Sequence, residues 1–527
     1  MWDCESRPTS GTVLSILLLP LIAAGLLPAQ TPIRGSVHPQ VQRAADLGPV
    51  SEETVLPALR ISFNPAGEQE LALDKMIAEQ RNPGSPSYHQ WLTPEQFGTR
   101  FGISMANETL MRQWLKSQGF KNVVLSRSRT AVTFTGTVEQ VRTAFHTEIH
   151  SLSIGGEQHY ANVGEIKIPD NLSSLVRNVS GLDDFRLQSR AHRVKPAFTG
   201  LLGSSVVHGL APGDIATIYD INSLYAAGID GSGMNVAVVG QSDIDLNDVA
   251  EYRSGYGLPD STPTVITYLG DPGVVSASKE EGELDVEILG AVAPKAQITF
   301  VTSPSVMNAL FYAIEQNVAP VVSMSFGYCE RGDTPSDQQD IQFATMQANA
   351  EGMTLLVASG DQGAADCDLQ SIPEGGAMNG AAIDSPSNQP GFTSVGGTSF
   401  SVGNGSYFAS ANGATGGSAI SYIPEKAWND TTSTNLLATG GGASIYYTKP
   451  GWQEGIGVPN DGARDVPDVS MFSLNEQEDG TQFGYLTCTD NMCASGINPG
   501  DQWGGTSAAA PVFCRYHYFA QRVSCFQ

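Results

Sequence analysis

The chain has 527 residues, of which 41% are hydrophobic and 16% charged, and its 28 Lys+Arg and 54 Asp+Glu give a net charge of −26. This hydrophobic content excludes a wholly disordered chain, and the length suggests roughly two to four domains. A chain this acidic repels phosphate, which argues against nucleic acid and anionic membrane surfaces as partners.

The charge is divided unevenly along the chain. Residues 1–200 hold 19 Lys+Arg and 18 Asp+Glu, whereas residues 201–527 hold 9 and 36. The change of composition predicts a domain boundary near residue 200. The net charge of the second part falls as its carboxylates protonate, so an acidic working environment is compatible with this composition.

Residues 13–27 read VLSILLLPLIAAGLL, an apolar run that is long enough for a secretory signal but short for a membrane span. We therefore predict a signal peptide over residues 1–29 and a secreted protein, either extracellular or periplasmic. An uncleaved membrane anchor is the alternative interpretation. No later segment is apolar enough to cross a bilayer.

Six cysteines follow the predicted signal, and six allow 15 connectivities that sequence alone does not choose between. For an exported protein we favour the pairs Cys329–Cys367 and Cys488–Cys493, with buried free thiols as the alternative. None of the spacings resembles a zinc site. The six residues are Cys329, Cys367, Cys488, Cys493, Cys514 and Cys525.

Residues 50–185 are predicted to form a small α/β domain. The expected strands are 59–63, 122–126, 130–136 and 148–154, and the expected helices are 67–80, 94–102, 106–118 and 137–145. Residues 186–208 carry several Arg and Lys with little periodicity, so we expect an exposed linker there.

From residue 209, short apolar runs alternate with helical patterns, which predicts a parallel sheet covered by helices on both faces. The expected strands are 234–240, 296–303, 320–327 and 354–360, and the expected helices are 280–292, 305–317 and 336–351. Residues 400–500 are rich in Gly, Ser, Asn and Thr, so they are predicted to form long loops with short strands. Ligand sites in such sheets lie at the carboxyl ends of the strands.

The sequence GGTSAAAP at 504–511 is typical of a tight turn that leads into a helix, where the helix N-terminus favours negative charge on Ser507. A purely structural glycine turn explains the pattern equally well. No histidine lies between residues 209 and 516, which argues against a Ser-His-Asp triad within this domain. A nucleophilic Ser507 would then need a carboxylate as its base.

The segment EEGELDVE at 280–287 supplies such carboxylates. On a helix, Glu281 and Asp285 are four residues apart and share a face, while Glu283 and Glu287 form a second pair on another side. A solvated acidic helix start is the alternative interpretation of the same segment.

These motifs resemble the sedolisins, the family of serine-carboxyl peptidases. The family pattern E-x-x-L-D matches residues 281–285, S-G-D matches 359–361 and G-T-S-A-x-x-P matches 505–511. The resemblance implies a subtilisin-like parallel sheet with helices on both faces, preceded by a small α/β (ferredoxin-like) pro-domain. It implies a zymogen with an inhibitory pro-domain over 50–185, a cleavage region at 186–208 and a peptidase domain over 209–527.

The resemblance also assigns roles to the candidate residues. Ser507 is the expected nucleophile, Glu281 its base, Asp285 the residue that orients Glu281 and shares a proton with it, and Asp361 the oxyanion donor. Because clustered carboxyls do not all ionise cheaply, and because Asp361 must carry a proton to donate, an acid optimum follows. We therefore expect a secreted acid endopeptidase that hydrolyses polypeptides.

One feature departs from the family pattern. The family's calcium site uses loops well after the nucleophile, but the 20 residues that follow Ser507 contain no Asp or Glu. We therefore expect no calcium or other cofactor in this chain, a C-terminally incomplete peptidase domain and impaired activity. A catalytically impaired relative that acts only as a binding protein is the alternative function, and an unrelated carbohydrate-binding α/β protein is a third.

Overall fold

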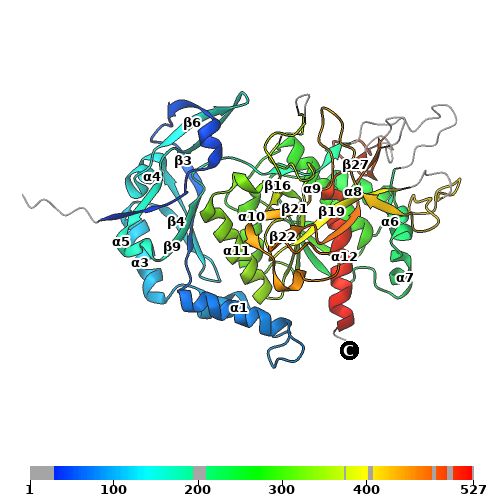
Figure 1. Cartoon of the computed structure of the whole chain (residues 1–527), viewed down its shortest axis with the longest axis horizontal. Helices are drawn as coiled ribbons and strands as arrows, with labels where there is room; N and C mark the ends of the chain where they lie inside the picture. The colour runs from blue at the N-terminus through cyan, green and yellow to red at the C-terminus, as the bar shows by residue number, and fades with distance from the viewer. Residues whose placement is uncertain are drawn as a thin grey trace, which may run out of the picture.

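The computed structural model describes residues 29–193, 209–368, 370–372, 376–401, 407–476, 482–494 and 502–524. The predicted signal peptide, most of the predicted linker and Cys525 lie outside these ranges. No helix in the described part of the chain is long and apolar enough to cross a membrane. The N-terminal and C-terminal parts form two adjacent bodies in Figure 1, with α1 of the first extending beneath the second.

The N-terminal body is built on an antiparallel sheet with the order β4-β5-β3-β9. This order, with helices in the two crossovers, is the ferredoxin-like arrangement expected for the pro-domain. A second sheet, β2-β6-β7, and the pair β1-β8 complete the body. The strands are β1 (Gln30–Ile33), β2 (Ala45–Pro49), β3 (Val55–Phe63), β4 (Lys121–Leu125), β5 (Ala131–Thr137), β6 (Ile149–Ile154), β7 (Glu157–Asn162), β8 (Ile166–Pro169) and β9 (Val176–Ser180).

Capping residues mark the starts of the helices in this body. Ser104, Thr93 and Thr137 each accept a hydrogen bond from a backbone N–H of the first turn, as N-cap residues do. The helices are α1 (Gly67–Arg81), α2 (Pro94–Phe101), α3 (Met105–Ser117), α4 (Val138–Phe145) and α5 (Asp170–Ser173). All four helices predicted from periodicity are present, within two residues of the expected bounds.

The C-terminal body is built on an eight-stranded sheet with the order β13-β14-β12-β15-β17-β19-β20, in which β23 also pairs with β19. All pairs except β19-β20 are parallel, as the continuous apolar runs predict. The strands are β12 (Asn235–Gly240), β13 (Thr264–Thr267), β14 (Gln297–Thr302), β15 (Val321–Met324), β17 (Thr354–Ala358), β19 (Thr393–Phe400), β20 (Glu425–Ala427) and β23 (Val469–Phe472).

Helices cover both faces of this sheet. In β12, Ala237 and Val239 pack in one core with α10 and α11, whereas Val236 and Val238 pack in another with α8, α9 and α12. The alternation follows from the two-residue period of a strand. The helices are α6 (Pro212–Ile218), α7 (Ile221–Ala226), α8 (Leu246–Gly255), α9 (Ser276–Val292), α10 (Val306–Glu315), α11 (Pro335–Ala350) and α12 (Thr506–Ser524).

One predicted strand is divided. The run 320–327 was expected as one strand, but β15 ends at Met324 and β16 (Phe326–Cys329) pairs with β10 (Gln188–Ser189) and β18 (Asp384–Ser385). The apolar pattern does not show the break, because both strands are buried. As a result, Ser325 lies at the carboxyl end of the sheet, where ligand sites of parallel sheets are found.

The expectation of an exposed linker is wrong for the first part of 186–208. Residues 188–189 form β10 against β16, and β11 (His192–Arg193) pairs with β27 (Gln502–Gly504). Arg190, between the two strands, is only 2% exposed. Its basic side chain enters the acidic C-terminal body. Local periodicity does not reveal the attraction between this guanidinium and the carboxylates there.

In the sequence, Arg515 is a charged interruption of the apolar pattern of the last helix, α12. Instead, Arg515 is 3% exposed and donates hydrogen bonds to the carbonyls of Val292 and Ile229. Its guanidinium also lies 4.5 Å from the ring centroid of Tyr225. Val292 is the last residue of α9, so Arg515 satisfies a helix C-terminal carbonyl and carries a positive charge to that end.

The two preferred disulfides are present: Cys329 is bonded to Cys367, and Cys488 to Cys493. Cys514 is a buried free thiol. The first disulfide ties β16 to the loop after β17. The second closes a short loop whose Cys488 N–H donates to Glu287 of α9 at 2.8 Å.

Candidate active site

The expected nucleophile and base are in contact. Ser507 lies in the first turn of α12, and its Oγ donates to Glu281 Oε2 of α9 at 3.0 Å. Both residues are 0% exposed. The preceding Gly505 has φ +111°, a conformation that side chains disfavour, so the glycine permits the turn that presents Ser507.

Asp285 lies one helical turn after Glu281, and it is also 0% exposed. Its Oδ1 accepts a hydrogen bond from Ser325 Oγ at 2.8 Å. Glu281 Oε1 and Asp285 Oδ2 have no hydrogen-bond partner among the described residues. Burial raises the pKa of both carboxyls, and the proximity of Glu281 raises the pKa of Asp285 further.

Glu281 Oε2 receives three donors. Besides Ser507 Oγ, it accepts hydrogen bonds from Ser189 Oγ at 2.6 Å and from the Arg190 N–H at 2.8 Å. Donors stabilise the ionised form of a carboxyl, whereas Asp285 has only Ser325. The geometry therefore favours a pair in which Asp285 holds the proton and Glu281 the negative charge.

Asp361, in the loop after β17, is fixed on one side by the residue before Ser507. The Thr506 N–H and the Thr506 Oγ1 both donate to Asp361 Oδ1 at 2.8 Å. The other oxygen, Oδ2, lies 2.7 Å from His192 Nε2 and 2.7 Å from the position that a Cβ would occupy at Gly505. Asp361 thus directs one carboxyl oxygen toward the turn that carries the nucleophile.

The alternative of a solvated acidic helix start is wrong, because Glu281, Glu283, Asp285 and Glu287 are at most 1% exposed. Glu283 forms an ion pair with Lys279 at 2.9 Å and accepts from the Asp245 N–H at 2.7 Å. Glu287 holds the Cys488 loop. Glu283 and Glu287 therefore stabilise the fold around α9, apart from Ser507, as their different face predicts.

Several residues of this site were missed by sequence reasoning. They are Ser189, Arg190, His192, Ser325, Gln362, Asp366 and Asp384. The available signal was charge: the C-terminal part has 36 Asp+Glu but only 9 Lys+Arg, while the segment before it is basic. That difference in charge predicts contact between the acidic C-terminal part and the basic segment before it, but it does not identify which residues pair.

Family models match both bodies: "Pro-kumamolisin, activation domain" matches residues 42–185, and "Subtilase family" matches residues 273–517. Sedolisin of Pseudomonas sp. (strain 101) is 27% identical over 512 residues, covering 93% of this chain and 81% of that protein. Kumamolisin of Bacillus sp. (strain MN-32) is 26% identical, covering 91% and 83%. Over most of the chain, these matches support assignment to the sedolisin family.

The similarity extends to more distant sedolisins. Tripeptidyl-peptidase 1 of Canis lupus familiaris is 23% identical, covering 91% of this chain and 82% of that protein. A solved Pseudomonas sedolisin, complexed with two molecules of pseudo-iodotyrostatin, aligns over 60% of this chain and 83% of its own at 26% identity, with a TM-score of 0.45. The matches to the family models and to these peptidases support a peptidase with a pro-domain, whose C-terminal body has the subtilisin-like fold.

We expected no calcium site in this chain, and the structure leaves that expectation as a prediction. In the described part of the chain, no three His, Cys, Asp or Glu side chains are grouped as a metal site requires. Carboxylate oxygens are the ligands that calcium prefers, and the residues after Ser507 supply none.

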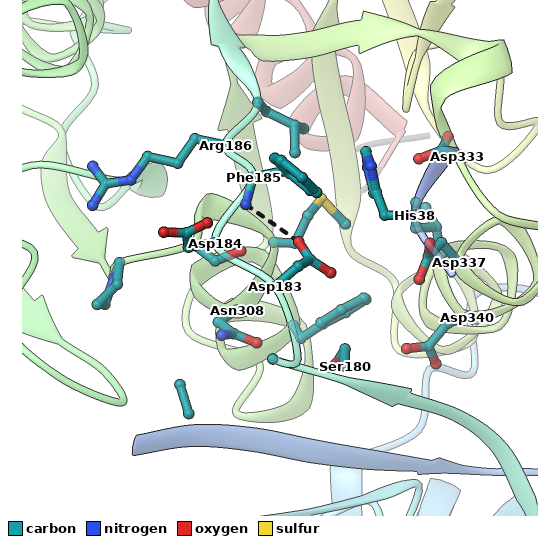
Figure 2. Close-up of a pocket in the computed structure, with 18 of the residues that line it drawn as sticks. His38, Ser180, Asp183, Asp184, Phe185, Arg186, Asn308, Asp333, Asp337 and Asp340 are labelled. Atoms are coloured by element: carbon teal, nitrogen blue, oxygen red, sulfur yellow. Dashed lines mark hydrogen bonds between the residues drawn. The ribbon is translucent and has the colours of Figure 1, made fainter. Parts of the chain in front are cut away.

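One cavity among the described residues lies away from Ser507. It has a volume of about 210 Å³ and lies between the two bodies, lined by His38, Asp183, Asp333 and Asp337 among others (Figure 2). Burial raises the pKa of Asp183 and of Asp333 to about 7, and the charge of Asp337 adds to both shifts.

Proposed function

We propose that this protein is a secreted, acid-active serine-carboxyl endopeptidase made as a zymogen, with Ser507 as nucleophile, Glu281 as base, Asp285 as the orienting acid and Asp361 as oxyanion donor. The observation that carries the proposal is the 3.0 Å hydrogen bond from Ser507 Oγ to Glu281 Oε2 in a fully buried site. A serine is activated by an adjacent base within hydrogen-bond distance, whichever side chain supplies it.

In the proposed reaction, Ser507 Oγ attacks a peptide carbonyl and Glu281 takes its proton. A protonated Asp285 would donate a hydrogen bond to Glu281. That bond would stabilise the Glu281 carboxylate and would give the buried Asp285 Oδ2 a partner. Glu281 then returns the proton to the leaving amine, and water hydrolyses the acyl-enzyme through the same groups.

Asp361 is suited to the oxyanion because its two oxygens have different environments. Oδ1 accepts two hydrogen bonds from Thr506, which leaves Oδ2 as the oxygen that would carry a proton. A protonated Oδ2 would donate to the negative oxygen that develops in the transition state. Burial raises the pKa of Asp285, whose proton the mechanism also needs, so activity is expected at acid pH and lost as the pH rises.

The pro-domain is proposed to inhibit the enzyme from within the cleft. Ser189 and the backbone of Arg190 already occupy two hydrogen-bonding positions of Glu281, and His192 contacts Asp361. A substrate cannot enter until this segment leaves. Secretion is supported by the apolar run at 13–27 and by the two disulfides, which form in oxidising compartments.

The test is peptide hydrolysis at pH 3–5 by the acid-activated protein. We expect Ser507→Ala and Glu281→Gln each to lower kcat by at least about 10³-fold, and the double variant to be little worse, because the residues act as one unit. Ser421→Ala and Glu454→Gln, at exposed positions, are the matched controls and should retain activity. Substantial turnover by Ser507→Ala would refute the mechanism.

A further inference from the structure

The Arg190 side chain occupies a pocket of three polar side chains beside Ser507. Its Nη1 donates to Gln362 Oε1 at 2.9 Å, and its Nη2 contacts Asp366 Oδ2 at 3.3 Å and the carboxylate of Asp384. We infer that Gln362, Asp366 and Asp384 form the specificity pocket of the enzyme, which selects polypeptide substrates with arginine immediately before the cleaved bond. The inference rests on the proposed peptidase function and names its substrate class.

The pocket is built for a cation. Asp384 is 0% exposed and Asp366 is 7% exposed, so two carboxylates are buried close to one guanidinium. Without a cation, both would be left as uncompensated buried charges, which is strongly unfavourable. Asp366 Oδ1 and Asp384 Oδ1 have no other hydrogen-bond partner among the described residues. A planar guanidinium with several N–H donors matches this arrangement better than an ammonium group.

Two glycines of the strand-end motifs make room for the pocket. A Cβ at Gly327 would lie 2.3 Å from Asp384 Oδ1, and a Cβ at Gly360 would lie 3.1 Å from Asp366 Oδ1. Gly327 follows Ser325 by two residues, and Gly360 directly precedes Asp361. The same loops therefore position the catalytic groups and the two acidic side chains of the pocket.

The backbone of the segment lies in the cleft as an added strand. Gln188 and Ser189 pair antiparallel with Gly327 and Phe326, and the Arg190 N–H donates to the carbonyl of Ser325 at 3.2 Å. Pairing of an extended peptide with an exposed strand is a common mode of peptide recognition.

The Arg190 carbonyl lies at the reacting groups. A Cβ at Gly505 would lie 2.2 Å from the Arg190 oxygen and 2.7 Å from Asp361 Oδ2, so both oxygens face the same point of the nucleophile turn. The Arg190 N–H shares Glu281 Oε2 with Ser507. A substrate in this register presents to Ser507 the carbonyl of the residue whose side chain fills the pocket.

The chemistry at this bond is ordinary hydrolysis. Ser507 Oγ bonds to the Arg190 carbonyl carbon, the bond from that carbon to the Ala191 nitrogen breaks, and Glu281 passes the serine proton to that nitrogen. Water then releases the acyl group from Ser507. Self-cleavage of the full chain should accordingly give a new N-terminus at Ala191.

The test compares two peptides, acetyl-Leu-Gln-Ser-Arg-Ala-His-amide and the same peptide with norleucine in place of arginine. For the acid-activated wild-type protein we expect kcat/KM to be on the order of 100-fold higher for the arginine peptide, since a pocket with buried charged acceptors rejects a ligand that lacks donors. In Asp366→Asn/Asp384→Asn the ratio should fall to a few-fold.

Two further variants guard the interpretation. Gln362→Leu removes one acceptor without touching the carboxylates, and should lower the ratio by roughly 10-fold even if the double variant fails to fold. Asp461→Asn changes a carboxylate outside the cleft, whose side chain is 38% exposed, and should leave the ratio unchanged.

The outcomes separate the two proposals. Equal turnover of both peptides by the wild-type protein overturns the pocket and leaves the peptidase function standing. No turnover of either peptide defeats the peptidase function, and the pocket is then judged by fluorescence anisotropy with labelled forms of both peptides and the Ser507→Ala/Arg190→Gly chain. Binding at least 10-fold tighter for the arginine peptide upholds the pocket, and equal affinity overturns it.

Discussion

Replacement of Arg60 tests what holds the pro-domain on the peptidase domain. Arg60, on β3, forms ion pairs with Glu315 of α10 at 2.7 Å and Asp340 of α11 at 2.9 Å, and its guanidinium lies 4.2 Å from the ring centroid of Phe311. The charged side chains are 5–7% exposed. Arg60→Met keeps the apolar contact but leaves two carboxylates buried without their main cation.

Breaking a buried ion pair by removing one partner costs about 3–5 kcal/mol. Arg177 remains 3.5 Å from Asp340, so we take the lower end and expect Arg60→Met to reduce the free energy of unfolding by about 3 kcal/mol at pH 8. Burial raises the pKa of Glu315 above its usual value. At pH 4.5 this carboxyl takes up a proton once Arg60 is gone, so the loss should be about half or less.

The assay is urea unfolding of the full chain at pH 8 and pH 4.5 in the Ser507→Ala background, which excludes self-cleavage. Arg142→Met is the control. The Arg142–Glu52 ion pair is similarly short, at 3.0 Å, but its side chains are 40% and 59% exposed. Exposed pairs contribute at most about 1 kcal/mol. A loss for Arg60→Met no larger than for Arg142→Met, or one that does not shrink at pH 4.5, would refute the reasoning.

Two other predictions concern stability. Burial raises the pKa of Asp183, Glu283 and Asp333 to about 7 and of Glu351 to about 8. The native state therefore binds more protons than the unfolded state between pH 4 and 8. Tm in the Ser507→Ala background should fall by roughly 5 °C or more from pH 5 to pH 8. A constant or rising Tm in differential scanning fluorimetry would contradict this. Because no three His, Cys, Asp or Glu side chains of the described residues are grouped as a metal site requires, millimolar calcium should change Tm by less than about 1 °C, and a rise of several degrees would reveal a calcium site.

Much of the fold follows from the sequence because its signals are local. The apolar runs at 234–240 and 354–360 are continuous, which is what strands buried on both faces require, and they form β12 and β17 of the parallel sheet. Helix α9 was expected from the spacing of its acidic and apolar residues. The pairing of the four disulfide cysteines was also predicted. Glu281 and Asp285 share a helical face by periodicity alone.

The contact between Ser507 and Glu281 needed more than local patterns. The two residues are 226 positions apart, and motif order implies their proximity only through the family resemblance. The physical reason for their meeting is the parallel sheet: α9 and α12 pack on the same face, and both present their catalytic residues toward the carboxyl edge of the strands.

Only the tertiary structure decided where the basic residues act. The local sequence pattern indicates a polar segment without periodicity at 186–208. It shows Arg515 as a charge that interrupts an apolar helix. In the folded chain, Arg190 fills a pocket made by Gln362, Asp366 and Asp384, and Arg515 satisfies the end of α9. A buried charge is stabilised only by partners brought from distant parts of the chain, so its role is set by packing and not by its neighbours in sequence.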